Sequence, residues 1–233
     1  MAKNMLKLLR KGRVYMIESI KNLAYSLGVC DIGFSSCTPP EEYSGLTNAI
    51  SIVIKMSSRV IDAIDTAPTH TYFHHYRTVN ALIDHILLRI GILLEQNGYG
   101  YVCIPASQSI EGKKGLMSHK QAAINAGLGT IGKSALFLSE KYGPRVRLGT
   151  IITDCDLSEG FKEPLKENLC SGCDLCVNAC PAMALSGKEF NDNAPELPII
   201  DVMACSKHMK EKFQHIGRGA VCGICMRVCP KGK

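Results

Sequence analysis

Two closely spaced runs of cysteine near its C-terminal end most constrain how this chain can fold. The runs are Cys170-x₂-Cys173-x₂-Cys176-x₃-Cys180-Pro181 and Cys222-x₂-Cys225-x₃-Cys229-Pro230. Twelve cysteines occur among the 233 residues, and eight of them follow residue 169. We therefore expect this part of the chain to form short turns around its thiols, in contrast with the periodic sequence before it.

The first run has the spacing found in bacterial ferredoxins that carry two [4Fe–4S] clusters. Three thiolates separated by two residues can reach three irons of one cluster, whereas the fourth, on the following helix, points toward a second cluster. The second run lacks the first of its three cysteines, and Cys205 is the only other cysteine between the runs. The expected ligand sets are Cys170, Cys173, Cys176 and Cys229 for one cluster, and Cys180, Cys205, Cys222 and Cys225 for the other.

Structural zinc is the alternative for these runs, since zinc also uses paired CxxC ligands. A tetrahedral zinc site gives no reason for a third cysteine at the next x₂ step followed by a Cys-Pro ending, so the spacing favours clusters. The remaining cysteines lie in apolar or strand-like contexts, where a free thiol behaves as a small core residue. They are Cys30, Cys37, Cys103 and Cys155.

Neither an export signal nor a membrane span is expected. Residues 1–13 are basic, but lysine and arginine interrupt their apolar residues, so we predict a cytoplasmic protein with reduced thiols. The most apolar later stretch, residues 86–94, is too short to span a bilayer and contains Arg89. The formal net charge of +6 is scattered along the sequence, which argues against a nucleic-acid partner.

Before residue 163 the sequence alternates between helical and strand-like periodicity, which predicts an α/β domain. Apolar residues at steps of three and four from Val79 to Leu94 predict a long helix that Asn97-Gly98 stops. Ser118 is expected to cap a short helix over residues 119–126. The other expected elements are a helix over 14–27, strands over 49–56, 99–104 and 146–153, and a loop over 105–115.

Three glycines, Gly127, Gly129 and Gly132, follow the short helix expected after Ser118. Glycine lets the backbone approach a flat or phosphate-bearing ligand closely. A tight turn between a helix and a strand explains the same residues, because their spacing is not the GxGxxG of a dinucleotide site. The glycines alone therefore do not choose between a ligand and a turn.

The string HKQAAINAGLGTIGKSALFLSEKYGPRVRLGTIITD, followed by both cysteine runs and the solitary Cys205, resembles epoxyqueuosine reductases and their relatives, the corrinoid-dependent reductive dehalogenases. The resemblance extends from about Val14 to Pro230 and is strongest from His119 onward. It implies a nitroreductase-like α/β (α+β) domain over residues 1–162 that binds base-off cobalamin. It also implies a small ferredoxin-like domain over residues 163–233, whose two clusters pass electrons to the cobalt.

The resemblance also implies which residues contact the corrin. The family's AGLGxIGK segment corresponds to Ala126, Gly127, Leu128, Gly129, Ile131, Gly132 and Lys133. Lys133 would meet a corrin amide or phosphate, and Lys207 is a looser candidate for the same pocket. Each lysine can instead be a solvated surface charge, which is the commoner fate of lysine.

Two departures from the family pattern bear on the substrate. The family places an aspartate just before the glycine segment as a proton donor, whereas residues 102–107 here read VCIPAS, and the chain stops three residues after Pro230 without a tRNA-binding extension. We therefore expect no reduction of epoxyqueuosine in tRNA. Candidate proton donors in place of the aspartate are Tyr72, His75, Tyr76 and His119.

The expected function is that of a cobalamin-binding iron–sulfur oxidoreductase acting on a small molecule or a corrinoid protein. An external donor of the ferredoxin or flavodoxin type would supply its electrons. Two alternatives stay open: a non-catalytic protein that binds cobalamin and reduces it for a partner, and a flavin-dependent iron–sulfur reductase with the same fold.

Overall fold

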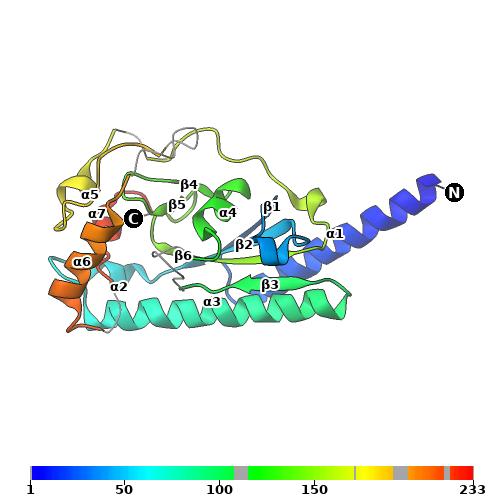
Figure 1. Ribbon diagram of the computed structural model, residues 1–233, viewed down its shortest axis with the longest axis horizontal. Helices are drawn as coiled ribbons and strands as arrows, with labels where there is room; N and C mark the ends of the chain where they lie inside the picture. The colour runs from blue at the N-terminus through cyan, green and yellow to red at the C-terminus, as the bar shows by residue number, and fades with distance from the viewer. Residues whose placement is uncertain (1, 108–114, 171, 191–198, 218–220, 233) are drawn as a thin grey trace. The chain divides into compact units, whose positions relative to one another are not determined.

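The computed structural model describes residues 2–107, 115–170, 172–190, 199–217 and 221–232, with side chains from residue 10 onward (Figure 1). Most of the loop expected over residues 105–115 lies outside this description. The chain divides into two compact units, each built from separate stretches of sequence. The first unit comprises Met1–Ile54, Asn80–Leu128 and Arg147–Pro164, and the second comprises Lys55–Val79, Gly129–Val146 and Leu165–Lys233.

A four-stranded sheet with the order β1-β2-β6-β3 forms the centre of the first unit. β1 (Asp31–Ser36) pairs antiparallel with β2 (Asn48–Lys55), and β3 (Tyr101–Ile104) pairs antiparallel with β6 (Val146–Thr153). Every residue of β2 from Ala49 to Ile54 is buried, which agrees with the apolar, β-branched sequence of a central strand. The mixed α/β class expected from the sequence is confirmed.

Helices α1 (Ala2–Ser26) and α3 (His70–Gln96) bury apolar stripes in this unit, as the helical spacing of those residues requires. α3 packs closely on β6, because a Cβ added at Gly149 would lie 2.5 Å from the Ile83 side chain. Gly98 ends α3 in a left-handed conformation with φ of +83°, as expected. The buried stripes contain Met16, Ile17, Ile20 and Ala24 in α1, and Ile83, Ile86, Leu87, Ile90 and Leu94 in α3.

Two ion pairs connect α1 to the 3₁₀ turn η3 (Ser158–Gly160) and to Asp156 just before it. Arg13 lies 2.6 Å from Asp156, and Arg10 lies 3.2 Å from Glu159. α1 is longer than the helix expected over 14–27, because the charges that interrupt its first turns do not prevent helix formation. The unit also contains η1 (Glu41–Tyr43) and α4 (His119–Asn125), which Ser118 caps by accepting the Gln121 N–H.

The second unit contains the two cysteine runs and the hairpin of β4 (Gly129–Ile131) and β5 (Phe137–Ser139). Its helices are α2 (Ser58–Asp62), α5 (Leu175–Asn178), α6 (Val202–Phe213) and α7 (Ile224–Val228), together with residues 70–79 of α3. A core of Met56, Ile61, Ile64, Tyr72, Val221, Ile224 and Met226 holds α2, α3 and α7 together. The unit is therefore larger than the ferredoxin-like domain expected over 163–233, whose boundary stays a prediction.

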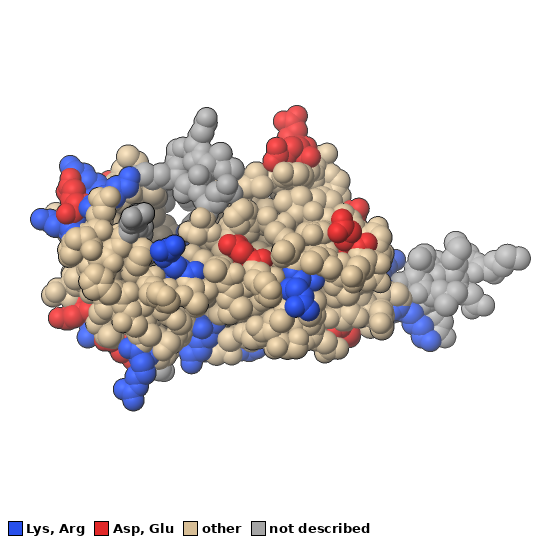
Figure 2. All heavy atoms as spheres, turned by 90° about the horizontal axis from the view of Figure 1, so that it is seen from below, with Lys and Arg blue, Asp and Glu red and all other residues tan. Residues whose placement is uncertain are grey.

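Two features of the whole sequence are visible in the structure. On the face shown in Figure 2, Lys and Arg side chains occur in small groups interspersed with Asp and Glu, as the scattered charge of the sequence predicts. None of the helices in the described part of the chain is both long and apolar enough to cross a membrane.

Candidate iron–sulfur site

The first cysteine-lined cavity of the second unit gathers four cysteines from both runs. Its empty volume is about 420 Å³, part of which is open to solvent. The cysteines are Cys170, Cys173, Cys176 and Cys229, and the other lining residues are Gly132, Ser134, Leu138, Leu175, Pro230 and Lys231. Cys229, far along the chain from the other three cysteines, thus faces the same cavity as the first three of the first run.

The second cavity gathers the other four cysteines and has an empty volume of about 430 Å³. They are Cys180, Cys205, Cys222 and Cys225, and the wall also contains Ser134, Pro181, Ala182, Ala184, Leu185, Ile200, His208, Met209 and Ile224. The structure therefore brings together the same two sets of four cysteines that the spacing groups into ligand sets. Among the described residues, no three His, Cys, Asp or Glu side chains lie close enough to hold a single metal ion.

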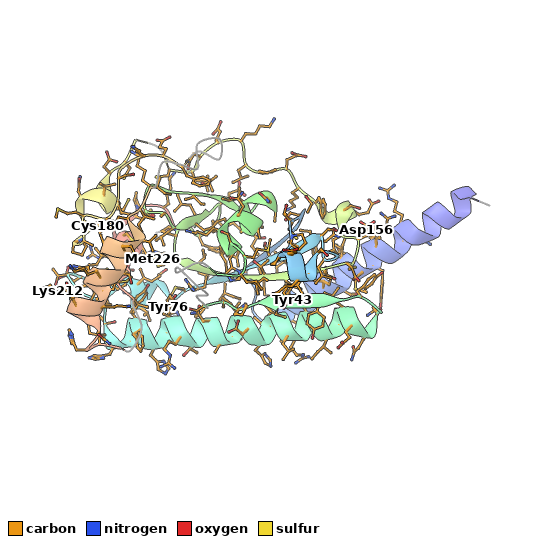
Figure 3. The ribbon with its side chains drawn as sticks, in the orientation of Figure 1. Tyr43, Tyr76, Asp156, Cys180, Lys212 and Met226 are labelled. Carbon is orange, nitrogen blue, oxygen red and sulfur yellow. The ribbon has the colours of Figure 1, made fainter. Side chains whose placement is uncertain are left out.

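Short helices place these cysteines. Cys176 lies on α5, and Cys180 follows that helix, with its N–H donating to the Val177 carbonyl at 3.2 Å. Cys205 lies on α6, whose first turn Asp201 caps by accepting the N–H groups of the second and third helical residues at 2.9 Å. Cys225 lies on α7, packed against α5 (Figure 3, where Cys180 and Met226 are labelled). Cys180 and Cys229 thus follow the helices α5 and α7 and do not lie on them, contrary to the expectation that the fourth cysteine of the first run lies on a helix.

Burial favours the protonated thiols of Cys222 and Cys225 when no metal is bound. It is the main cause that raises the pKa of Cys222 to about 11 and that of Cys225 to about 12, and the neighbouring cysteines contribute to both shifts. The pKa values of Cys176 and Cys229 in the first cavity are also raised, mainly by burial. Such thiols become thiolate ligands when a cation binds, and metal binding then releases protons.

The hairpin β4–β5 brings a tight turn to the wall of both cavities. In this turn the Ala135 N–H donates to the Gly132 carbonyl at 2.8 Å, and the Gly132 N–H donates to the Leu136 carbonyl at 3.0 Å. Ala135 adopts a left-handed conformation with φ of 58°, which costs a non-glycine residue roughly 1–3 kcal/mol. The surrounding structure therefore holds this turn in a strained shape.

The glycines of the AGLGTIGK segment meet protein atoms. A Cβ at Gly129 would collide with the Leu138 carbonyl oxygen and the Phe137 ring, and a Cβ at Gly127 would lie 2.7 Å from the Glu163 carbonyl oxygen. At Gly132 an added Cβ would lie 2.9 Å from the Leu138 side chain. Packing within each unit is thus sufficient to explain all three glycines.

Lys133 lies beside the first cysteine-lined cavity. Its backbone N–H points to the Cys170 sulfur at 3.5 Å, and its ammonium group lies 2.8 Å from Asp174. The hydrogen bond to Asp174 raises the pKa of Lys133. Lys207, by contrast, is exposed on α6 and lies 3.9 Å from Glu211. Ala126, Leu128 and Ile131 are buried, and contact of any of these residues with cobalamin stays a prediction.

Three of the four expected proton donors lie close together on the first turns of α3. The Tyr72 and Tyr76 rings are 6.4 Å apart, and both pack against the core that contains Met226 (Figure 3). Tyr72 is buried, whereas Tyr76 is partly exposed. His75 accepts the Ser57 N–H on Nε2 at 3.0 Å, and burial followed by the charge of His74 lowers its pKa. His75 therefore has no proton on Nε2 to donate.

His119 belongs to the first unit and has both ring nitrogens bonded. Nε2 lies 3.0 Å from the Pro105 carbonyl oxygen and Nδ1 lies 2.8 Å from the Thr150 hydroxyl. A carbonyl can only accept, so Nε2 carries the proton and Nδ1 accepts from Thr150. Burial is the main cause that lowers the pKa of His119. These bonds give His119 a structural role.

Sequence reasoning missed two residues near the cavities. Asp174 follows Cys173 directly, and its charge beside a cysteine run was the signal that could have indicated an ion pair. Ser134 follows the glycine segment, and no local pattern indicates that it lies in the wall of both cavities. The four cysteines that were not expected to bind a cluster, Cys30, Cys37, Cys103 and Cys155, line neither cavity. Burial is the main cause that raises the pKa values of Cys103 and Cys155 to about 11.

Comparison with known families identifies the cysteine-rich segment. Residues 169–232 match the family described as the 4Fe-4S double cluster binding domain. Together with the two cavities of four cysteines each, this match defines a protein with a C-terminal 4Fe–4S double cluster domain.

Its homologues include epoxyqueuosine reductases and reductive dehalogenases. The epoxyqueuosine reductase of Gloeobacter violaceus is 34% identical over 128 residues, which cover 50% of this chain and 36% of that protein. The tetrachloroethene reductive dehalogenase of Desulfitobacterium hafniense is 26% identical over 83% of this chain and 35% of its own length. The chain thus spans about a third of the length of these relatives.

Solved structures of both groups share the fold. A catabolic reductive dehalogenase in complex with 3-bromo-4-hydroxybenzoic acid superposes with a TM-score of 0.74 at 21% identity, covering 93% of this chain and 32% of that one. An epoxyqueuosine reductase with a tRNA stem loop superposes with a TM-score of 0.63 at 18% identity, covering 96% and 66%. The chain is therefore related to iron–sulfur reductases of both kinds in sequence and in fold.

Proposed function

We propose that this chain is an iron–sulfur reductase in which two [4Fe–4S] clusters pass electrons one at a time to a bound cobalamin for the reduction of a small substrate. The observation that carries the proposal is the pair of cavities, each lined by four cysteines within a segment that matches a double cluster domain. When bound, such clusters supply single-electron transfer at low potential.

The cysteines of each cavity are proposed as the ligands of one cluster. Four thiols around one cavity match the four thiolates that a [4Fe–4S] cluster requires. Apolar side chains in the walls, such as those of Leu138 and Ile224, limit the contact of the sulfurs with water. Burial and low solvent exposure are among the factors that set cluster potential.

The cobalamin part of the proposal is supported by relatives. One neighbour, with a TM-score of 0.73 at 20% identity, is described as a reductive dehalogenase whose structure suggests a mechanism for B12-dependent dehalogenation. Segment 126–133 is the proposed contact, although its contacts described above are internal to the protein. Cobalamin would supply the bond-breaking reduction that no side chain can perform.

The chain's own residues would bind the substrate and donate the proton that its reduction consumes. Tyr76 is the proposed donor, because it is partly exposed, while Tyr72 is buried and the rings of His75 and His119 are held by other bonds. Residues 102–107 contain no carboxylate, which supports a substrate other than epoxyqueuosine in tRNA. Organohalides are the proposed class, and an external ferredoxin or flavodoxin is the proposed electron donor.

An anaerobic experiment tests the proposal in two stages. Purified protein is assayed for iron and acid-labile sulfide, then mixed with cobalamin, desalted and assayed for cobalt and absorbance. About eight irons and one cobalt per chain are expected. Zinc in place of iron, or about four irons, contradicts the cluster assignment, and retention of flavin without cobalt favours a flavin enzyme.

Turnover then separates an enzyme from an electron relay. The loaded protein, a strong one-electron reductant and tetrachloroethene or 3-bromo-4-hydroxybenzoic acid should release halide over many turnovers. Epoxyqueuosine-containing tRNA, assayed in parallel, should yield no queuosine. Cobalt reduction without turnover of any of these compounds favours a protein that reduces cobalamin for a partner.

A further inference from the structure

We propose that Ser134 donates a hydrogen bond to cluster sulfur from the wall that the two cysteine-lined cavities share, and thereby raises the reduction potential of the cluster it contacts. This inference rests on the two clusters of the proposed function. It concerns a residue whose position in the structure, rather than its sequence motif, indicates the role.

The position of Ser134 is the first observation. Of the described residues that line the cavities, Ser134 is the one that appears in the wall of both. It is 6% exposed. A group placed there faces the cavity of Cys170, Cys173, Cys176 and Cys229 and also the cavity of Cys180, Cys205, Cys222 and Cys225.

The bonding of the Ser134 hydroxyl is the second observation. Its oxygen accepts the Leu136 N–H at 3.4 Å, and within the described part of the chain no acceptor takes its proton. A buried hydroxyl proton without an acceptor is unfavourable. Each cavity offers four cysteine sulfurs in its wall, and bound clusters would add sulfide, so sulfur is the acceptor at hand.

The backbone of the turn is the third observation. The backbone hydrogen bonds of Gly132 to Leu136 and of Ala135 to Gly132 hold Ala135 at φ of 58°. The Lys133 N–H points to the Cys170 sulfur at 3.5 Å. Strained conformations persist where the surrounding structure requires them, and they gather at functional sites. This turn therefore presents one N–H and one O–H donor toward the cavities.

A donor in this position acts on the electron-transfer step. In the cluster-loaded protein, an electron from an external ferredoxin- or flavodoxin-type donor would raise the negative charge of a cluster by one, and the proton would stay on Ser134 Oγ. A hydrogen bond to sulfur stabilises the more negative, reduced cluster, so it raises the potential. Ser134 is thus a positioning and tuning residue, and it forms no covalent bond.

The test compares Ser134→Ala with Ser134→Thr in the cluster-loaded protein by redox titration monitored by electron paramagnetic resonance. Ser134→Ala should make the reduction potential of at least one cluster more negative. The expected shift is up to about 59 mV, which corresponds to a tenfold change in a one-electron reduction equilibrium. Ser134→Thr keeps the hydroxyl and should stay near the parent. Ser186→Ala, an exposed serine that lines neither cavity, is the matched control and should match the parent.

Iron content separates failure of this inference from failure of the proposed function. A parent protein without about eight irons refutes the two clusters themselves. If a fully loaded Ser134→Ala protein has the same reduction potentials as the parent, the role of Ser134 is overturned, whereas the two clusters of the proposed function are not. If Ser134→Ala loses iron, Ser134→Thr and Ser134→Val are compared, because threonine and valine have the same shape and only threonine has a hydroxyl. Iron retained only in the threonine variant supports the hydroxyl contact. Equal loss of iron in both variants overturns it.

Discussion

The ammonium group of Lys133 lies 2.8 Å from a carboxylate oxygen of Asp174, although the two residues are 41 positions apart. The lysine side chain is 11% exposed and the aspartate side chain 55%. The pair connects the turn of the β4–β5 hairpin to the loop between Cys173 and Cys176. It therefore joins the strained turn to the first cysteine run.

Removing the acid alone should destabilise the second unit. Asp174→Asn leaves the Lys133 ammonium without its carboxylate, so the variant should unfold at a lower urea concentration than the parent. Lys133→Met together with Asp174→Leu should cost less than Asp174→Asn, because no buried charge is left. Urea unfolding of all three proteins under anaerobic conditions measures this difference. A double variant that is no more stable than Asp174→Asn would contradict this explanation.

Replacing Cys229 should damage the cluster of the first run. Cys229 lies in the cavity of Cys170, Cys173 and Cys176, so Cys229→Ala should reduce the iron content from about eight to about four and leave the cluster of the second cavity intact. Cys180→Ala should do the reverse. Iron analysis and electron paramagnetic resonance distinguish the two outcomes. Cys30→Ala, outside both cavities, should retain all the iron.

A side chain at Gly129 should break the hairpin. The new Cβ collides with the Leu138 carbonyl, so Gly129→Ala should lower unfolding free energy by about 1–3 kcal/mol or more and displace the Ser134 turn. Thermal unfolding and iron retention report the change. Gly45→Ala is the control, because a Cβ there meets nothing within 4 Å. If Gly129→Ala is as stable as the parent, the hairpin is less rigid than its contacts indicate.

Because the thiol of Cys155 is buried, the free energy of unfolding should fall at alkaline pH. Its folded pKa of about 11 lies above the ordinary value of 9.0, so the unfolded chain loses the proton first as pH rises. The thiol is neutral in both states below about pH 8, and stability then falls between about pH 9 and 11, by roughly 2 kcal/mol at pH 11. Urea unfolding at pH 8 and 10.5 should show a smaller pH dependence in Cys155→Ala. Equal pH dependence in both proteins would contradict the shift.

Tyr76→Phe should lower turnover without altering the clusters. Loss of a positioned proton donor typically costs about 10²–10⁴ in rate, whereas the ring that packs against the core is kept. Halide release measures the rate, and iron content provides the check on folding. His75→Gln should have little effect on rate, since the Nε2 atom already accepts from Ser57. A Tyr76→Phe enzyme at parental rate would exclude this tyrosine as the donor.

The long-range grouping of the cysteines could be predicted because cluster ligands follow a strict spacing. Cys205 and Cys229 join their cavities across long stretches of chain, yet counting thiols already assigns them to these sets. The core of α3 was predictable for a similar reason, as its apolar positions repeat with the helical period. The first turns of α3, which begin at His70, could not be predicted, because residues 70–78 carry aromatic and polar side chains without a continuous apolar stripe.

The hairpin and β1 could not be predicted from local patterns. β4 and β5 are three residues long, too short to show alternation, and β1 contains Gly33, which faces Ala126 closely. Ser134 and the Lys133–Asp174 pair depend on this hairpin, so sequence reasoning could not place them. It assigned the glycines to a possible ligand, whereas their positions are explained by contacts with Leu138 and Glu163.

The three separate stretches of the second unit have a consequence for biosynthesis. Cys170, Cys173 and Cys176 leave the ribosome about fifty residues before Cys229, and domains generally fold only when all their parts have been synthesised. Neither cavity has its fourth cysteine until the second run has emerged. Iron delivered before that point would meet an incomplete set of thiols, so cluster assembly should await the second run, by which time Ser134 and its hairpin have already been synthesised.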